Sequence, residues 1–245
     1  MYVHYGCSYL CAPKEWVNFD ASFTLRFERL PVVGKLYTKN SQRFPEHVRY
    51  GDITRGLPIQ DCSADAAYAS HVLEHLSLEE FHRALDNTLR ILKPGGVFRA
   101  VVPDLEHLAK QYLRSLQTDD PFGNDRFLRG SYLGRVKRPK TLKDLFVTFL
   151  RTSEHFWMWD RCSLTYALKQ HGFVDVRLCA MGDNPDPMFA LVEDSSRFEQ
   201  AVAVEARCPI QTGGHVDNSV YKVHGAGLPM EVEITSSRIP IAAGS

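Results

Sequence analysis

Acidic and histidine side chains follow several short apolar runs of this sequence, at the points where the runs end. Asp20 ends the run WVNFD, Asp52 follows VRYG, and Ser70 and His71 follow ADAAYA. If these runs are parallel strands, the residues lie at one edge of a sheet, where doubly wound folds bind ligands. An acidic residue that ends the second strand can accept both hydroxyls of a ribose, and one after the third strand can accept from an adenine amine. The pattern predicts a nucleotide-type site, with turn formation as the alternative role of each aspartate.

The segment His71-Val72-Leu73-Glu74-His75 also matches H-x-x-E-H, a zinc motif of one class of peptidases. That chemistry needs the motif on one helix, near a third protein ligand. Here the segment follows a predicted strand, and the next helix begins only after Ser77. We therefore expect no bound metal, and we expect His75 to pack or to form a hydrogen bond where the helix begins. A zinc metalloenzyme built on His71, Glu74 and His75 is kept as a minor alternative.

The elements that must position these residues alternate between short apolar strands and helical patterns, which is typical of parallel βαβ units. Ser77 and Glu80 form a capping box for the helix after the fourth strand, and Asp104 and Asp160 cap two further helices. The predicted fold is α/β, a doubly wound, mostly parallel seven-stranded sheet in which the last strand lies antiparallel beside the fifth. The predicted strands are Tyr2–Cys7, Glu15–Ala21, Val48–Thr54, Ala64–Ser70, Val97–Val102, Val174–Cys179 and Ala201–Arg207.

Three regions depart from this regular alternation. Only about nine residues separate the first two strands, which is short for a crossover helix. Residues 118–156 form a basic insert, expected to be helical, that is either a solvated lid or a holder of an anionic acceptor. Residues 209–245 lack periodicity and read as an irregular extension, with Met230–Thr235 a candidate strand. The basic side chains of the insert include Arg126, Arg129, Arg135, Lys137, Arg138, Lys140 and Lys143.

Composition excludes several classes of protein. Lys+Arg and Asp+Glu both number 29, so the overall charge gives no reason to expect a nucleic-acid partner. The apolar runs are shorter than the roughly 20 residues that a membrane helix needs, and the start MYVHYGCSYL lacks the features of a signal peptide. The six cysteines form no C-x-x-C pair and suit a reducing compartment. We therefore expect a cytoplasmic protein without a membrane anchor.

The run from VRYGDIT through ADAAYASHVLEHLSLEEFHRALDNTLRILKPGGVFRAVVPDL resembles class I S-adenosylmethionine-dependent methyltransferases of the type-11 group. HVLEH and LKPGG carry the resemblance, and HGFVDVRL resembles the strand near the end of that domain. WVNFDAS, after a shortened glycine turn, resembles a branch in which the second strand follows the first almost at once. The resemblance implies a methyltransferase domain over residues 1–208 with S-adenosylmethionine as cofactor. The residues it implies around the cofactor are Tyr5, Gly6, Cys7, Asp20, Asp52, Ile53 and Ser70.

The resemblance also places His71 beside the transferred methyl group, where a histidine can act as general base for an acceptor that loses a proton. His155, in the segment HFWMWD, is the second candidate at the rim of the site. The expected acceptor is a small molecule of anionic or sugar-like chemistry. The glycine turn departs from the family, because GCSYLCAP keeps only Gly6 and has Ser8 where another glycine is expected.

Two other functional classes follow from that departure and from the fold. The alternative to an enzyme is a non-catalytic nucleotide-binding or scaffold protein on the same fold. A dehydrogenase using NAD is disfavoured, because no G-x-G-x-x-G opens the first helix.

Overall fold

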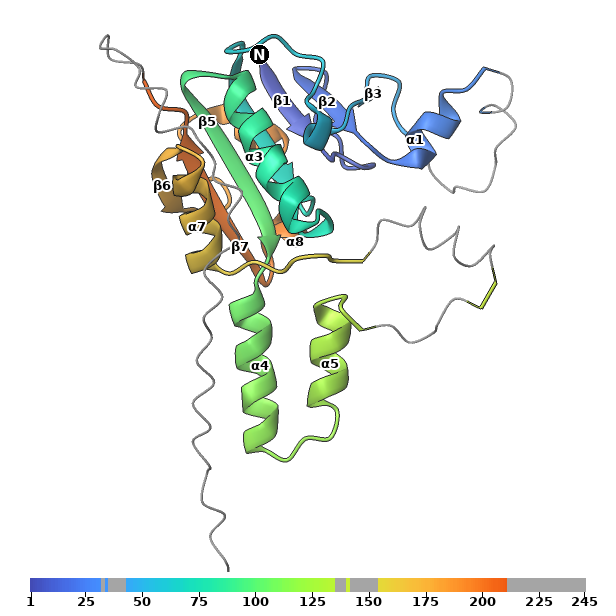
Figure 1. Ribbon diagram of the computed structural model, residues 1–245, viewed down its shortest axis with the longest axis vertical. Coiled ribbons are helices and arrows are strands. Elements are labelled where there is room, and N and C mark those ends of the chain that lie inside the picture. Colours follow the sequence, from blue (N-terminus) through green and yellow to red (C-terminus); the bar gives the residue numbers. More distant parts are fainter. Residues whose placement is uncertain (32–33, 35–42, 135–139, 142–153, 211–245) are drawn as a thin grey trace, which may run out of the picture. The chain divides into compact units, whose positions relative to one another are not determined.

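The computed structural model describes residues 1–31, 34, 43–134, 140–141 and 154–210. Within them one sheet has the strand order β3-β2-β1-β4-β5-β7-β6 (Figure 1). The strands are β1 (Tyr2–Tyr5), β2 (Trp16–Asp20), β3 (Arg49–Tyr50), β4 (Ala64–Ser70), β5 (Leu92–Pro103), β6 (Val174–Leu178) and β7 (Ala201–Arg207).

The strand directions confirm the predicted fold. β1 pairs in parallel with both β2 and β4, β4 pairs in parallel with β5, and β7 lies antiparallel between β5 and β6. The chain runs outward from β1 to β2 and β3 and then returns to β4 on the other side of β1. Strand order therefore reverses between β1 and β4, which is where a doubly wound sheet opens a crevice for a ligand.

One face of the sheet is covered by the helices that the sequence predicts. α3 (Leu78–Ile91) begins with the capping box: Glu80 N–H donates to Ser77 Oγ, and Ser77 N–H donates to the Glu80 carboxylate. α7 (Arg161–Gln170) is capped by Asp160, and Gly172 follows it with a φ of 86°. Apolar side chains of both helices pack against β1, β4, β5 and β7 in one continuous core. We call this side the α3 face.

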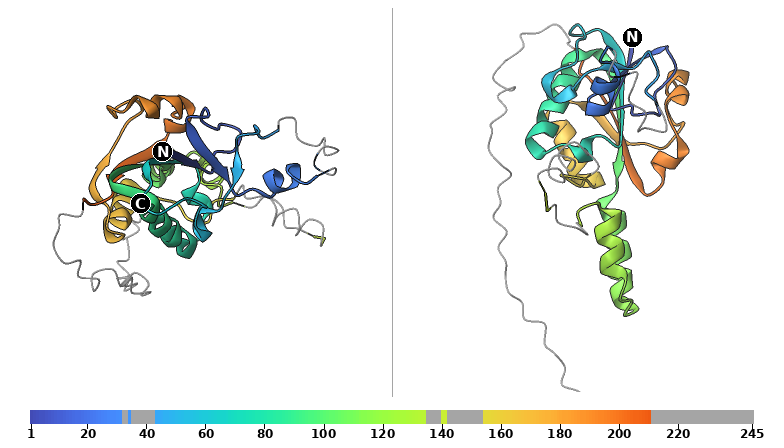
Figure 2. Two further views of the ribbon diagram at one scale, coloured as in Figure 1. Left: turned by 90° about the horizontal axis from the view of Figure 1, so that it is seen from above. Right: turned by 90° about the vertical axis from the view of Figure 1, so that its right-hand side faces the viewer.

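The opposite face of the sheet is covered by a segment that comes much later in the sequence than the strands beneath it (Figure 2, right). Residues 6–15 connect β1 to β2 without a helix. The connection between β6 and β7, residues 179–200, lies over the face instead and carries η3 (Pro187–Leu191) and α8 (Ser195–Phe198). Phe189 packs against Trp16 there, in a cluster that also contains Tyr68. We call residues 179–200 the covering segment, and this side the covered face.

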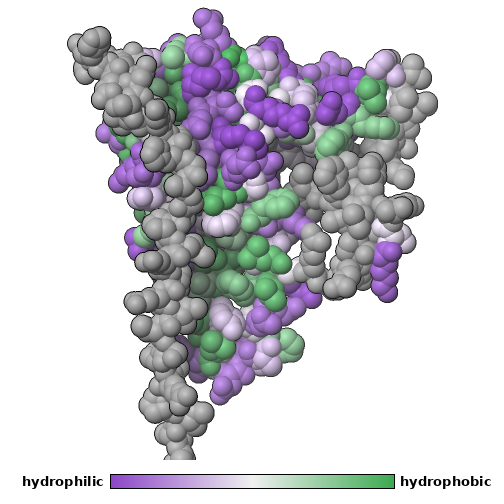
Figure 3. Space-filling view, viewed as in Figure 1, coloured by the Kyte–Doolittle hydropathy of each residue, from purple (hydrophilic) through white to green (hydrophobic). Residues whose placement is uncertain are grey.

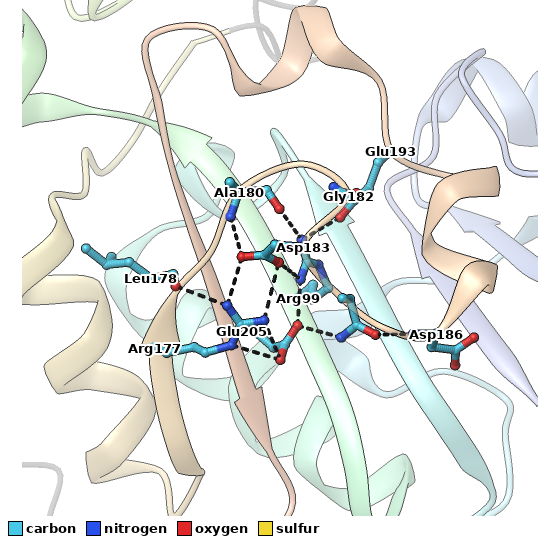
Figure 4. A network of polar contacts seen from close by, with 10 residues as sticks. Arg99, Arg177, Leu178, Ala180, Gly182, Asp183, Asp186, Glu193 and Glu205 are labelled. Atoms are coloured by element: carbon cyan, nitrogen blue, oxygen red, sulfur yellow. Dashed lines mark hydrogen bonds and ion pairs between the residues drawn. The ribbon is translucent and has the colours of Figure 1, made fainter.

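A buried ion network holds the covering segment to the sheet (Figure 4). The Arg99 side chain on β5 is 1% exposed, and its guanidinium lies 2.7 Å from a Glu193 oxygen and 2.8 Å from an Asp183 oxygen. It also donates to Glu205 on β7 at 2.5 Å and to the carbonyl of Ala180 at 2.8 Å. One buried guanidinium thus binds acceptors from three separate stretches of the chain.

The helix after β5 is largely exposed. α4 (Leu105–Gln117) is capped by Asp104, as predicted, but only Leu108 and Ser115 of the helix are buried. The apolar side chains of Leu113 and Leu116 are 58% and 54% exposed. The reason is that α4 continues past the end of β5, where α5 (Gly123–Gly130) lies beside it and no sheet does (Figure 1). Apolar side chains gather over this pair of helices in the lower half of Figure 3.

The remaining short elements are α1 (Phe23–Glu28), η1 (Ile53–Arg55) and η2 (Leu73–His75). In the part of the chain that the structure describes, every helix falls short of the length and apolarity needed to cross a membrane. The predicted strand Met230–Thr235 lies outside the described residues, as do Arg135, Lys137, Arg138 and Lys143 of the basic insert. Two arginines of the insert are described, and both are paired: Arg126 with Asp120, and Arg129 with Asp125.

Candidate functional site

The turn after β1 has the backbone of a glycine-rich loop although it contains one glycine. Gly6 has a φ of 67° and Ser8 a φ of 48°, both in the left-handed region that side chains disfavour. A Cβ on Gly6 would lie 2.2 Å from the side chain of Val72, so this position requires glycine. Ser8, which stands where the family resemblance leads us to expect glycine, adopts the conformation that a glycine would take.

Asp20, at the end of β2, holds this turn in place. Its carboxylate accepts from the backbone N–H of Ser8 at 2.8 Å and from that of Ser22 at 2.8 Å. The residue is buried. Each carboxylate oxygen has a second lone pair, so Asp20 can still accept from a ribose hydroxyl while it holds the turn.

A small cavity of about 20 Å³ lies beside the turn, between the sheet and the covering segment. Three of its side chains have buried polar atoms with no hydrogen-bond partner among the described residues: His4 Nδ1, Tyr68 Oη and Ser70 Oγ. Burial lowers the pKa of His4 to about 3 and raises that of Tyr68 to about 12, so both side chains are neutral at neutral pH. The lining residues are His4, Gly6, Cys7, Leu10, Tyr68, Ser70, Val192, Asp194 and Arg197.

Not all of the expected cofactor residues face this cavity. Gly6, Cys7 and Ser70 line it, and Asp20 is bonded to the adjoining turn. Tyr5 points to the α3 face, where its hydroxyl lies 3.0 Å from Thr88 Oγ1. Ile53 is buried in the apolar core of the same face.

Asp52 caps a short helix, which is the turn-forming role that the sequence analysis gave as the alternative to ligand binding. Its carboxylate accepts from Thr54 N–H at 2.9 Å and from the Thr54 hydroxyl at 2.7 Å, and so begins η1. Its other oxygen lies 3.4 Å from Arg55 Nε. Like Asp20, Asp52 therefore forms local hydrogen bonds and has lone pairs left, and its contact with the cofactor stays a prediction.

A second group of polar side chains follows β4. His71 has a φ of 54°, and its Nε2 lies 2.9 Å from the carbonyl oxygen of Arg197 in the covering segment. A carbonyl only accepts, so Nε2 carries the proton and Nδ1 carries a lone pair. That Nδ1 lies 3.5 Å from Oε1 of Glu74, whose side chain is 1% exposed. Both Glu74 oxygens are buried without a hydrogen-bond partner among the described residues.

His75 and His155 complete this group. His75 Nδ1 lies 3.0 Å from the Glu154 carbonyl, which leaves the lone pair on Nε2, 4.0 Å from Glu74 Oε1. The rings of His75 and His155 are 4.9 Å apart between centroids. The Glu74 carbonyl accepts from Phe156 N–H at 2.8 Å, so the backbone itself brings His155 to Glu74. We call Glu74, His75 and His155 the Glu-His cluster.

Burial determines the charges of the cluster. It raises the pKa of Glu74 to about 8, because the carboxylate is taken out of water and the charge of Arg197 offsets only part of that effect. It lowers the pKa of His155 to about 4 and lowers those of His71 and His75. The imidazoles are therefore neutral at neutral pH, and those of His71 and His75 direct a lone pair toward Glu74.

Sequence reasoning missed three residues of these two regions. His4 and Tyr68 were counted only as strand residues, although their places on β1 and β4 put them on the covered face near the strand ends. Arg197 gave no signal, because nothing local links residue 197 to His71. His155 was identified as a rim residue, but its contact with Glu74 and His75 was not.

Comparison with known proteins supports the sequence-based resemblance. Residues 24–100 match the family model described as a methyltransferase domain. A S-adenosylmethionine-dependent methyltransferase from Archaeoglobus fulgidus is 15% identical, with 84% of this chain and 85% of that chain covered and a TM-score of 0.43. One from Thermotoga maritima is also 15% identical, with coverages of 84% and 81% and a TM-score of 0.45. A comparison with curated proteins gives no match.

Both TM-scores are below 0.5, so the assignment rests on the strand order and on the family match. The match to a methyltransferase domain covers residues 24–100, and the strand order of the sheet to which they contribute is that of a doubly wound fold.

Proposed function

We propose that this methyltransferase domain is active, and that it transfers the methyl group of S-adenosylmethionine to a small hydroxyl-bearing acceptor of anionic or sugar-like chemistry. The observation that carries the proposal is the match over residues 24–100 together with the turn after β1, where Gly6 and Ser8 keep the backbone of a cofactor-binding loop. Asp20 beside that turn has acceptor capacity left for a ribose.

The fit of the cofactor is mixed. Glycine at position 6 and the unpartnered hydroxyl of Ser70 suit a polar ligand at the strand ends. The cavity of about 20 Å³ has room for little more than a water molecule, whereas ligand pockets measure about 300–1,000 Å³. Binding therefore requires residues 194–197 of the covering segment to move off the strand ends. S-adenosylmethionine, when bound, supplies the electrophilic methyl group.

Within this proposal His71 is the candidate base, because it follows β4 next to the cofactor turn. His155 is the second candidate and lies deeper, against Tyr132, with 4.9 Å between the ring centroids. If His71 removes the acceptor proton, His71→Ala should lower turnover by about 10²–10⁴-fold and leave cofactor affinity nearly unchanged. Full turnover in that variant would transfer the role to His155.

The narrow cavity favours a second candidate function, a non-catalytic protein on the methyltransferase fold. Calorimetric titration with S-adenosylmethionine, S-adenosylhomocysteine and NAD separates the two functions. The enzyme proposal expects saturable binding of the first two ligands and not of NAD, weakened in Asp20→Asn by about 5- to 150-fold as charge-assisted hydrogen bonds are lost. Affinity no better than millimolar in the wild type supports the non-catalytic function. Binding recovered by Ser8→Gly would then place the defect in the turn.

A cytoplasmic location belongs to the same proposal. It is supported by the six cysteines, none of which is paired in the structure, including the buried Cys7.

A further inference from the structure

The Glu-His cluster brings a buried carboxyl group and imidazole nitrogens close enough for a proton or a metal ion to lie among them. Glu74 Oε1, His71 Nδ1 and His75 Nε2 all present lone pairs, and they face one another at 3.5 Å and 4.0 Å from the carboxylate oxygen. In each histidine the other ring nitrogen donates its N–H to a backbone carbonyl. The nitrogen that faces Glu74 therefore carries the lone pair. Acceptors facing acceptors repel unless a proton or a cation lies among them.

The burial of Glu74 makes such a partner necessary. A buried carboxyl group is either neutral, because it holds a proton, or coordinated to a metal ion that replaces the proton. Among the described residues, no Arg or Lys forms an ion pair with Glu74; the charge of Arg197 acts on it only from a distance, and the Arg197 carbonyl accepts from His71. The site has the composition of a metal centre, a carboxylate and imidazoles.

We propose that Glu74, His75 and His155 bind a divalent transition-metal ion. One ligand atom from each of the three residues lies within 4.8 Å of those of the other two. Metal bonds of about 2.0–2.2 Å bring such atoms to about 3.3 Å apart, a contraction that side-chain rotation supplies. Two imidazoles and a carboxylate suit Zn²⁺ and its neighbours in the first transition row better than Mg²⁺ or Ca²⁺.

The surroundings of the ligands support the same chemistry. Metal-binding histidines usually donate their other ring N–H to a carbonyl or carboxylate, which orients the ring, and His75 does this to Glu154 at 3.0 Å. The His75 side chain is 25% exposed, whereas Glu74 is buried. A bound ion would thus keep an open position on the His75 side, where a water or an acceptor oxygen can coordinate.

This inference replaces the sequence-based expectation of no metal. The sequence analysis disfavoured the H-x-x-E-H motif because the segment follows a strand and the next helix begins only after Ser77. The structure places Glu74 and His75 in the short turn η2 and brings His155 to them through the Glu74 carbonyl. His155 is 80 residues away from His75 in sequence, so local spacing could not indicate it.

The test is metal binding by the full chain, stripped of metal with a chelator that is then removed. Titration with Zn²⁺ should show one ion per chain, and Co²⁺ should give the visible absorption of a four- or five-coordinate ion. We expect Glu74→Gln, His75→Ala and His155→Ala each to weaken Zn²⁺ binding by about 100-fold or more. His75→Ala is the variant least expected to disturb folding, because its side chain is partly exposed. Circular dichroism checks each variant.

Two controls separate this site from surface binding. His107→Asn on α4 should bind as the wild type does. His82→Gln tests the other paired histidines, since His82 Nδ1 lies 2.8 Å from His171 Nε2 on the α3 face. Loss of the ion in His82→Gln, equal Zn²⁺ affinity in wild type and Glu74→Gln, or an absence of saturable binding would each overturn the proposal. None of these measurements depends on methyl transfer, so the metal proposal and the proposed function fail separately.

Discussion

The two faces of the sheet are closed by different means. On the α3 face, helices α3 and α7 each lie next in sequence to a strand that they cover, and the contact is mainly apolar. On the covered face, a segment from between β6 and β7 lies over β1 and β4, and a buried ion network around Arg99 holds it down. The first face depends on hydrophobic burial and the second on charge pairing as well.

This difference has an energetic consequence. Apolar packing loses stability in proportion to the volume removed and is insensitive to pH. A buried ion network adds little over an apolar equivalent when it is complete, but breaking it leaves uncompensated charges in a dry interior. The covered face, which also borders the candidate cofactor site, should therefore respond more strongly to single charge changes and to acid than the α3 face does.

The largest expected effect is the loss of Arg99. Arg99→Met should lower the free energy of unfolding by about 3–5 kcal/mol, because Glu193 remains buried without a cation and Glu205 keeps only the partly exposed Arg177. Urea denaturation measures it. Arg177→Met is the matched control: this side chain is 43% exposed and pairs with the same Glu205, so we expect less than about 1 kcal/mol.

A triple variant sharpens the comparison. Arg99→Met combined with Glu193→Gln and Glu205→Gln removes the stranded charges and should recover part of the lost stability. A single Arg99→Met variant as stable as the wild type would show that the covering segment is held by apolar contacts alone.

The second expected effect is a loss of stability in acid that originates from His4. Burial lowers its pKa to about 3, from 6.5 in the unfolded chain, so between these values the unfolded chain binds the extra proton. The stability it contributes is present above pH 6.5 and is lost as the pH falls toward 3, by about 1.4 kcal/mol per pH unit. The cation of Arg197 disfavours a positive charge on His4. The ring of Tyr68, whose centroid lies 5.4 Å from that of His4, carries no charge that would stabilise it.

His4→Gln checks this, since it removes the titration while keeping a polar side chain. Between pH 6 and pH 4 the free energy of unfolding of the variant should fall less steeply than that of the wild type, whereas His107→Gln should leave the slope unchanged. Equal slopes for His4→Gln and wild type would mean that His4 is protonated as easily in the folded protein as in the unfolded chain.

A smaller effect is expected where the covered face meets the turn after β1. Asp20→Ala leaves the Ser8 and Ser22 N–H groups without their acceptor and should cost about 1–3 kcal/mol. Asp52→Ala is the comparison, a lost cap on a three-residue turn, at about 0.5–2 kcal/mol. If Asp52 proves the costlier of the two, the turn after β1 is held by contacts other than the carboxylate.

The same division between the two faces separates what the sequence predicted from what it did not. Ala64–Ser70 and Ala201–Arg207 were predicted with their observed bounds, and the caps at Ser77, Asp104 and Asp160 are all present. These depend on local patterns of apolar spacing and capping. The position of the covering segment depends on pairs such as Arg99 with Glu193, which are distant in sequence, and no local pattern contains them.

The candidate site was predictable only in part for the same reason. Gly6, Asp20 and Ser70 come to the strand ends because they end parallel strands, which a pattern of strands predicts. The inward turn of Ile53 and the partners of Glu74 depend on how η1 and η2 fold after their strands. Single residues after a strand can leave the sheet in several directions, and only tertiary packing selects one.

The smallest effect concerns Ser8, where two opposing contributions must be compared. A left-handed φ of 48° costs a residue with a Cβ about 1–2 kcal/mol, and glycine removes that cost. Glycine also gives the unfolded chain more freedom, worth about 0.5–1 kcal/mol. Strain relief is the larger of the two, so Ser8→Gly should stabilise the protein by about 0.5–1 kcal/mol in urea denaturation. Ser8→Ala keeps the Cβ and should give no gain.

Because the Asp20 carboxylate holds Ser8 N–H in place, the stability gained by Ser8→Gly should be smaller in an Asp20→Ala background, where the turn can relax without the glycine. An equal gain in both backgrounds would mean that Asp20 does not impose the strain. The packing of Gly6 against Val72 alone would then determine the conformation of the turn.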